Sequence, residues 1–411
     1  MPNTISDIRV REILDSRGNP TIEVTIHSLN EKATCSVPSG ASRGTYEAIE
    51  LRDGDPNRYN GKGVLRAINN INEVIAPALI GANLESQKNI DSILLELDGT
   101  NNKSHLGANA ILAISIGTAK LAAKIKGLEL HEYIREYYHI APSPHQGSIK
   151  IFANMINGGA HAVKSTSVQE FQIVPMHDTV AENVELIRSF QDKLTTKLTE
   201  QASSALGTGD EGGYTISGYS TGQVLELMHN IKAEMQVGSR IAFSMDIAAN
   251  ELYSKGNYKI DGQELRPELY QEMITDIVGN YHVFAIEDPF EEQDFDSFKE
   301  LRQKHPETMI IGDDLTVTNA TRLKKAIETK SIDGLIVKPN QIGTLSETLE
   351  VITMAHQNDI RCIASHRSGE TNDDFIIDIA WGTGCFGVKI GAIQRGERVA
   401  KYNRLLELSQ K

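Results

Sequence analysis

The chain has 411 residues, 55 of them acidic and 41 basic, which gives a formal net charge of −14. This charge argues against a nucleic-acid ligand, because phosphate backbones bind clustered lysines and arginines. The length favours two or three domains, and the three cysteines show no paired spacing that would indicate a zinc site or a disulfide framework.

The beginning of the sequence, MPNTISDIRVREILDSRG, places charges where a signal peptide needs an uninterrupted apolar stretch. We therefore expect a cytoplasmic protein. The longest weakly polar segment, Leu106 to Ala119, is shorter than the roughly 20 residues that span a bilayer. We interpret it as a buried or amphipathic helix and expect no membrane insertion.

The first 30 residues alternate as strands do, with IRVREI and TIEVTIHS separated by the turn-prone DSRGNP. From residue 62 to about 138, apolar residues recur at intervals of three and four, which predicts helices that stop at Gly81 and Gly127. The pattern predicts a small α+β domain over residues 1–140. Residues 141–147, APSPHQG, carry two prolines and form the candidate linker.

Over residues 147–411, short apolar runs alternate with amphipathic helical stretches. Six of these runs end in a charged or imidazole side chain: Asp246, Glu287, Asp313, Lys338, His366 and Lys389. The last five lie 23 to 28 residues apart, the length of one strand, one helix and two loops. This spacing predicts an α/β barrel with the six side chains at the carboxyl ends of its strands, where barrel enzymes have their active sites.

The order of these side chains predicts carboxylates on one side of the barrel mouth and cations on the other. Asp246, Glu287 and Asp313 suit Mg²⁺, which prefers hard oxygen ligands. Lys338, near a metal and another cation, would have a lowered pKa and could act as a general base. Such a base can abstract the proton α to a metal-bound carboxylate, because the metal takes up the charge of the enediolate.

Two glycine-rich segments add to this chemistry, SVPSGASRGTYEA at residues 36–48 and GTGDEGGY at residues 207–214. Such loops supply backbone N–H groups to phosphate oxygens or close over a site, although most are merely turns. The glycines around Glu211 would let its carboxylate approach a substrate closely. We interpret Glu211 as a candidate general acid, with a loop carboxylate without a role as the alternative.

The sequence resembles the enolase family almost from end to end. The matching motifs are VPSGAS, YEAIELRDGD, GKGV, LDGTNNKSHLGANAIL, NGGAH, QEF, GDEGG, IEDPFEE, GDDLTVTN, KPNQIGTLSET, SHRSGET and GERVAKYN. The resemblance implies a small α+β domain followed by an enolase-type (β/α)8-like barrel whose beginning departs from strict β/α order. It also implies reversible dehydration of 2-phospho-D-glycerate to phosphoenolpyruvate and water by a homodimer or larger homo-oligomer.

The resemblance also implies roles for individual residues. A first Mg²⁺ would be bound by three carboxylates: Asp246, Glu287 and Asp313. Ser42 would help to hold a second Mg²⁺ together with the substrate phosphate. Lys338 would remove the C2 proton, and Glu211, supported by Glu170, would protonate the departing C3 hydroxyl. The remaining implied residues contact the substrate or line its pocket: His161, Gln169, His366, Arg367, Ser368 and Lys389.

The chain departs from the family pattern in several loops. Arg43 follows Ser42 where the family commonly has threonine, and residues 163–166 read VKST where a glycine and a small or amide residue are common. Residues 214–216 read YTI in place of the usual Ala-Pro, and KIGAIQRGER replaces a stretch in which Thr, Pro and Ser are frequent. These changes leave open a diverged enolase paralogue that dehydrates a related phospho- or phosphono-hydroxy acid.

Two further alternatives differ in class. Superfamily members that racemise or cycloisomerise commonly use a Lys-x-Lys pair on an early barrel strand, where this chain offers Glu170 and Glu211. A surface-displayed binding protein, recognised through Lys411, would not need the metal ligands and proton-transfer residues that the sequence retains.

Overall fold

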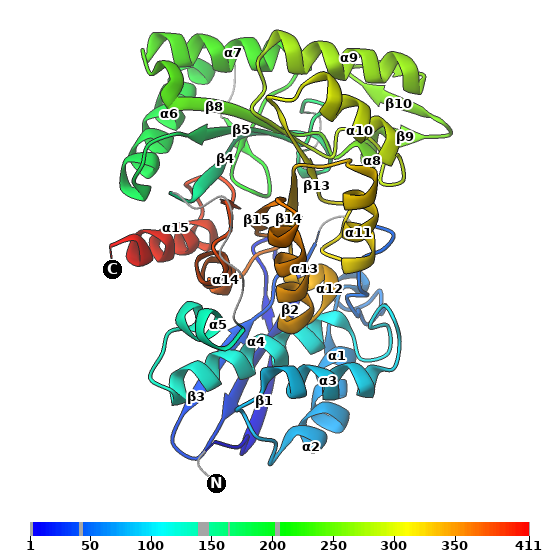
Figure 1. The fold of residues 1–411 in the computed structure, drawn as a ribbon, viewed down its shortest axis with the longest axis vertical. Helices are drawn as coiled ribbons and strands as arrows, with labels where there is room; N and C mark the ends of the chain where they lie inside the picture. The colour runs from blue at the N-terminus through cyan, green and yellow to red at the C-terminus, as the bar shows by residue number, and fades with distance from the viewer. Residues whose placement is uncertain (1–2, 41–43, 139–147, 163–164, 202–205, 411) are drawn as a thin grey trace.

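The computed structural model describes residues 3–40, 44–138, 148–162, 165–201 and 206–410. An α+β domain formed by the N-terminal part of the chain lies against one end of a barrel formed by the rest (Figure 1). The predicted linker 141–147 lies outside the described residues.

The N-terminal domain contains a three-stranded antiparallel sheet. Its strands are β1 (Asp7–Leu14), β2 (Pro20–His27) and β3 (Lys32–Ser36), in the order β1-β2-β3. In the turn between β1 and β2, the Asp15 carboxylate accepts hydrogen bonds from the N–H groups of Arg17 and Asn19 at 2.9 and 2.8 Å. Gly18 has a φ of +74°, which glycine adopts without strain. The predicted hairpin is therefore confirmed, with Pro20 in the strand.

The helices of this domain are α1 (Leu65–Asn70), α2 (Ala76–Leu79), α3 (Gln87–Asp98), α4 (Ala108–Ile125) and α5 (Leu130–Tyr138). A 3₁₀ turn (Tyr59–Gly61) precedes them, and a π-helical turn (Ile71–Ile75) joins α1 to α2. Helix α4 packs on β2 and β3, where a Cβ at Gly117 would come within 2.9 Å of Ile26. This helix is long and apolar enough to cross a membrane, but 83% of it is buried inside the protein. It is the buried helix that the sequence predicted.

The barrel strands are β4 (Lys150–Asn157), β5 (Glu170–Pro175), β8 (Ile241–Asp246), β12 (Ala285–Glu287), β13 (Met309–Gly312), β14 (Gly334–Val337), β15 (Arg361–Ser365) and β16 (Gly387–Lys389). Each strand pairs with the next, and β16 pairs with β4, which closes the sheet. Neighbours run parallel except at β5, which is antiparallel to both β4 and β8. The predicted barrel with an irregular beginning is confirmed.

Apolar side chains from these strands form a buried cluster: Phe152, Val174, Ala285, Met309, Ile311, Ile336 and Ile363. The helices of the barrel domain are α6 (Val180–Gln201), α7 (Thr221–Glu234), α8 (Ala249–Leu252), α9 (Pro267–Asn280), α10 (Phe295–Lys304), α11 (Ala320–Thr329), α12 (Pro339–Ile342), α13 (Leu345–Gln357), α14 (Phe375–Thr383) and α15 (Gly396–Ser409). Two 3₁₀ turns (Gly159–His161 and Gly238–Arg240) and short strands accompany them, namely β6 (Gly207–Thr208), β7 (Tyr214–Thr215), β9 (Tyr253–Ser254), β10 (Asn257–Ile260) and β11 (Gln263–Leu265).

Candidate active site

The six predicted side chains all lie at the carboxyl ends of barrel strands. Three of them are the last residues of their strands: Asp246, Glu287 and Lys389. The other three follow directly after a strand: Asp313, Lys338 and His366. Five of the six line one cavity of about 40 Å³, and the sixth, Glu287, lies behind it against the Lys389 ammonium at 2.8 Å. The spacing in the sequence therefore located the mouth of the barrel correctly.

The Lys389 ammonium lies among three buried carboxylates. Its Nζ is 2.7 Å from Asp246, 2.8 Å from Glu287 and 2.9 Å from Glu170. Burial, reinforced by the Asp246 carboxylate, raises the pKa of Glu287 well above its ordinary value. Burial and the neighbouring Glu211 carboxylate raise the pKa of Glu170 to about 8. The three carboxyl groups around Lys389 thus outnumber the single positive charge of its ammonium.

Glu170 reaches Lys389 because of the direction of β5. The strand runs antiparallel to β8, so its first residue, Glu170, pairs in register with the last residue of β8, Asp246. The preceding Gln169 donates from Nε2 to Asp246 Oδ2 at 3.0 Å. Gln169 and Glu170, two residues to which the resemblance gives roles in the active site, therefore both line the cavity.

Asp313 makes a different set of contacts, with Lys338 and Gln341. Lys338 Nζ forms a short ion pair with Asp313 Oδ2, and Gln341 Nε2 donates to Asp313 Oδ1 at 2.9 Å. Burial works to lower the pKa of Lys338, but the Asp313 carboxylate outweighs it and the pKa is raised. The sequence predicts a lowered pKa for Lys338 beside a bound metal ion; in the protein alone the Asp313 carboxylate acts in the opposite direction, so the prediction stays untested.

Glu211 lies in a loop that packs closely on β4. Asn154 Nδ2 donates to Glu211 Oε2 at 3.1 Å, and His366 Nε2 lies 3.2 Å from Glu211 Oε1. A Cβ at Gly213 would stand 2.8 Å from Asn157 Oδ1, so the glycines of this loop permit its approach to the strand. The Glu211 carboxylate is buried and lines the cavity. The glycines thus let the loop pack on β4; the close approach to a substrate that the sequence predicts stays a prediction.

Arg367 and Ser368 follow His366 and also line the cavity. The Arg367 guanidinium is buried and lies 3.2 Å from the carboxylate of Glu47, a residue of the N-terminal domain. Gln341 Nε2 donates to Glu47 as well, at 3.3 Å. Sequence reasoning missed Glu47, although it falls in the YEAIELRDGD motif, because its partner is 320 residues away.

Two further acid groups at the mouth, Asp288 and Asp314, were also missed. Carboxylate oxygens of Asp288, Asp313 and Asp314 lie within 4.8 Å of one another and could hold a metal ion. Asp288 accepts the backbone N–H groups of Asp313 and Asp314 at 2.9 and 2.7 Å. The sequence could have indicated them, because each directly follows a predicted strand-end acid: Asp288 follows Glu287 in IEDP, and Asp314 follows Asp313 in GDDL.

The predicted Mg²⁺ ligands divide into two groups in the protein alone. Asp246 and Glu287 share the Lys389 ammonium, whereas Asp313 pairs with Lys338. Glu287 Oε1 is buried and has no hydrogen-bond partner among the described residues. An unpartnered buried carboxylate oxygen, surrounded by further carboxylates, fits a hard divalent cation. The donor set at the mouth is therefore suited to Mg²⁺.

Some predicted residues cannot be placed. Ser42 and Arg43, together with residues 163–164 of the altered loop, lie outside the described residues. His161 ends a short 3₁₀ turn, and its side chain is outside the described part of the structure.

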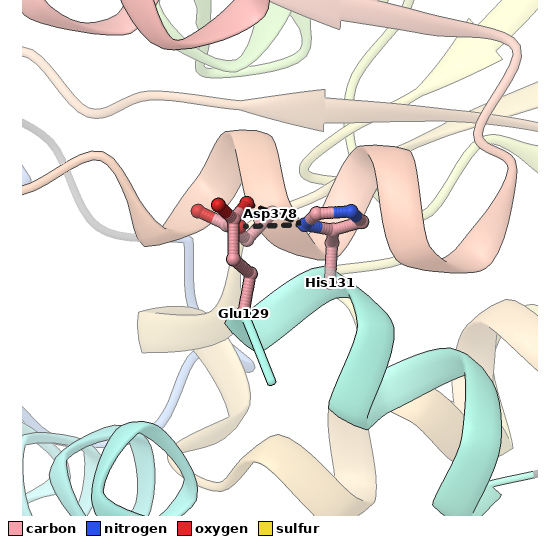
Figure 2. A group of neighbouring side chains, drawn as sticks. All are labelled: Glu129, His131 and Asp378. Carbon is pink, nitrogen blue, oxygen red and sulfur yellow. Dashed lines mark hydrogen bonds and ion pairs between the residues drawn. The ribbon is translucent and has the colours of Figure 1, made fainter. Parts of the chain in front are cut away.

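A second group of possible metal ligands lies away from the mouth, between α5 and α14. Figure 2 shows Glu129, His131 and Asp378 facing one another. Arg404 Nη2 lies 2.6 Å from Asp378 Oδ1 and 3.0 Å from Glu129 Oε2. Both carboxylates thus already have Arg404 and the His131 imidazole as neighbours, so we interpret the group as a structural ion-pair network.

The fold and the mouth together define a barrel protein with buried acids and lysines arranged for acid–base chemistry. Comparison with known proteins agrees. A family model described as the N-terminal domain of enolase matches residues 5–134, and one described as the enolase C-terminal TIM barrel domain matches residues 149–411. An enolase of Corynebacterium kroppenstedtii is 44% identical over 416 aligned residues, which cover 99% of this chain and 95% of that protein. The chain belongs to the enolase family.

Proposed function

We propose that this protein dehydrates 2-phospho-D-glycerate reversibly to phosphoenolpyruvate and water, as a Mg²⁺-dependent hydro-lyase. One observation carries the proposal: Lys338 and Glu211 line the same cavity, and strands bearing carboxylates lie between them around the barrel. This arrangement gives a base and an acid separate access to one small substrate. The membership of the enolase family supports it independently.

Lys338 would act as the general base. Its neutral amine would take the proton from C2 of the substrate, and the electron pair of that bond would pass into an enediolate. Since the Asp313 carboxylate raises the pKa of Lys338, the amine is available only when that negative charge is compensated. Bound Mg²⁺ supplies positive charge that compensates the carboxylates and stabilises the enediolate.

Glu211 would act as the general acid, with Glu170 behind it. The C3–O bond would break as Glu211 protonates the departing hydroxyl, releasing water. The pKa of Glu170 is raised to about 8 by burial and by Glu211, so this neighbour holds a proton at neutral pH. The raised pKa supports Glu170 as a source of the proton that Glu211 needs.

The other cavity residues would bind the substrate and the metal ions. We assign the phosphate to Arg367 and Ser368 and the substrate carboxylate to Lys389. The pocket walls would be completed by His161, Gln169 and His366. Asp246, Glu287 and Asp313 would hold one Mg²⁺. Ser42 would hold a second with the phosphate.

Turnover of 2-phosphoglycerate by purified protein, with and without Mg²⁺, tests the activity. Hydrogen exchange in deuterated water then tests the two roles. Glu211→Gln should exchange the C2 hydrogen without forming product, whereas Lys338→Ala should do neither. Exchange that survives in Lys338→Ala and is lost in Glu211→Gln would reverse the assignment.

The alternative substrate, a related phospho- or phosphono-hydroxy acid, rests on Arg43, and the comparisons do not favour it. Its test is the ranking of 2-phosphoglycerate against analogues with an added carboxylate or phosphonate, in wild type and Arg43→Thr. The same ranking in both proteins, with 2-phosphoglycerate best by a wide margin, would remove the main support of the alternative. We also propose that the protein is cytoplasmic and forms a homodimer or larger homo-oligomer, whose size light scattering would measure. We propose domains at residues 1–140 and 147–411, whose boundary limited proteolysis would test.

A further inference from the structure

Arg398, in the first turn of α15, connects two loops of the candidate active site. Its side chain is completely buried. Nη1 donates to the carbonyl oxygen of Arg367 at 2.7 Å, and Nη2 donates to those of Ser368 and Asp210 at 2.8 and 3.2 Å. One guanidinium therefore ties the loop that follows β15 to the loop that carries Glu211.

The same guanidinium also contacts the imidazole of His366. Arg398 Nη1 lies 2.9 Å from His366 Nδ1. A guanidinium has only donors and stays charged in proteins, so Nδ1 must be the acceptor and can carry no proton. The proton of the neutral ring is then on Nε2, which lies 3.2 Å from Glu211 Oε1 without forming a hydrogen bond of ordinary geometry in this structure. The contact with Arg398 thus decides that the nitrogen facing Glu211 is the one that carries the proton.

The surroundings of His366 oppose a second proton on the ring. The ring is 2% exposed, and a Cβ at Gly391 would lie 2.9 Å from His366 Cε1, so the ring is closely packed. The charged groups that act on it come from three segments: Arg398 of α15, Lys389 of β16 and Glu211 of the loop before β7. Burial and Arg398 lower the pKa of His366 to about 3, although Glu211 works in the opposite direction.

We propose that Arg398 is a positioning residue that fixes His366 in the Nε2–H tautomer, so that His366 presents its Nε2–H toward Glu211 and takes up no proton during the reaction. The importance for turnover rests on the proposed function, in which Glu211 is the general acid. The tautomer itself rests only on the contact between the guanidinium and the imidazole.

A direct test is ¹⁵N NMR of protein labelled in its 12 histidines, with a His366→Asn sample to identify the signal. In wild type, His366 should have an unprotonated Nδ1 and a protonated Nε2, unchanged between about pH 5 and pH 8, where ordinary histidines titrate. A protonated Nδ1, or titration of His366 within this range, would overturn the proposal. This measurement needs no variant of Arg398, so it decides even if such variants fail to fold.

Variants then separate positioning from a merely structural role. Arg398→Met should raise the pKa of His366, although burial still holds it below its ordinary value, and any acid limb that His366 adds to the pH profile of kcat should move to higher pH. Arg398→Lys keeps a donor and should restore the wild-type profile. Arg395→Met is the matched control, because Arg395 begins the same helix segment and donates to Gly209 O at 2.9 Å, in the same loop as Glu211.

Arg395→Met should leave the His366 signals unchanged. If Arg398→Met and Arg395→Met both leave them unchanged, the tautomer does not depend on Arg398 and the proposal is wrong. The NMR result is also independent of turnover. A wild-type protein with the expected tautomer that fails to convert 2-phosphoglycerate would refute the proposed function alone.

Discussion

Replacing Lys389 by methionine tests the electrostatics of the mouth. The ammonium lies 2.7 to 2.9 Å from three buried carboxylates, and methionine keeps most of the volume without the charge. Removing one partner of a buried ion pair typically costs about 3–5 kcal/mol, because the remaining charge is left uncompensated. An unfolding entropy of about 2.1 cal/mol/K per residue, over 411 residues, converts this cost into a fall in Tm of about 4–6 °C.

Differential scanning calorimetry with a chelator would measure this fall, and added Mg²⁺ should raise the Tm of Lys389→Met more than that of wild type. The matched control is Lys401→Met, which removes another buried ammonium whose one carboxylate partner among the described residues is Glu370, at 2.8 Å. Its loss of stability should not depend on Mg²⁺. A Lys389→Met protein with the wild-type Tm, or with no added response to Mg²⁺, would refute this account of the mouth.

Three further predictions follow from single contacts. Glu47→Gln deprives the buried Arg367 of its carboxylate and should lower kcat/KM for 2-phosphoglycerate by about 10- to 100-fold, as expected for one charged hydrogen bond. Asp313→Asn should weaken Mg²⁺ binding in calorimetry while the fold is retained, and unchanged affinity would contradict its role as a ligand. Burial works to raise the pKa of Asp378, but His131 and Arg404 lower it overall. Arg404→Met should therefore reduce the free energy of unfolding above about pH 4, and urea titrations should show this difference shrinking as the pH falls further.

Much of the candidate active site at the barrel mouth was determined by the sequence itself. A barrel strand buried on both faces is a short continuous apolar run, and the polar residue that ends it must lie at the rim. Asp246, Lys338 and Lys389 could therefore be placed from the pattern alone. The glycines beside Glu211 leave no side chain that would keep this loop away from β4, although the sequence did not indicate that strand as its neighbour.

Contacts between segments far apart in the chain were decided only by the tertiary structure. Glu170 begins its strand, and it reaches the mouth only because β5 runs against its neighbours, a direction that an apolar run does not encode. The raised pKa of Lys338 depends on Asp313, which approaches from another strand. Glu47 meets Arg367 across the domain boundary, and Arg398 meets His366 from the last helix. Local patterns fix which residues lie at a strand end, but the charge and hydrogen-bond state of each depend on neighbours that only the closed barrel brings within contact distance.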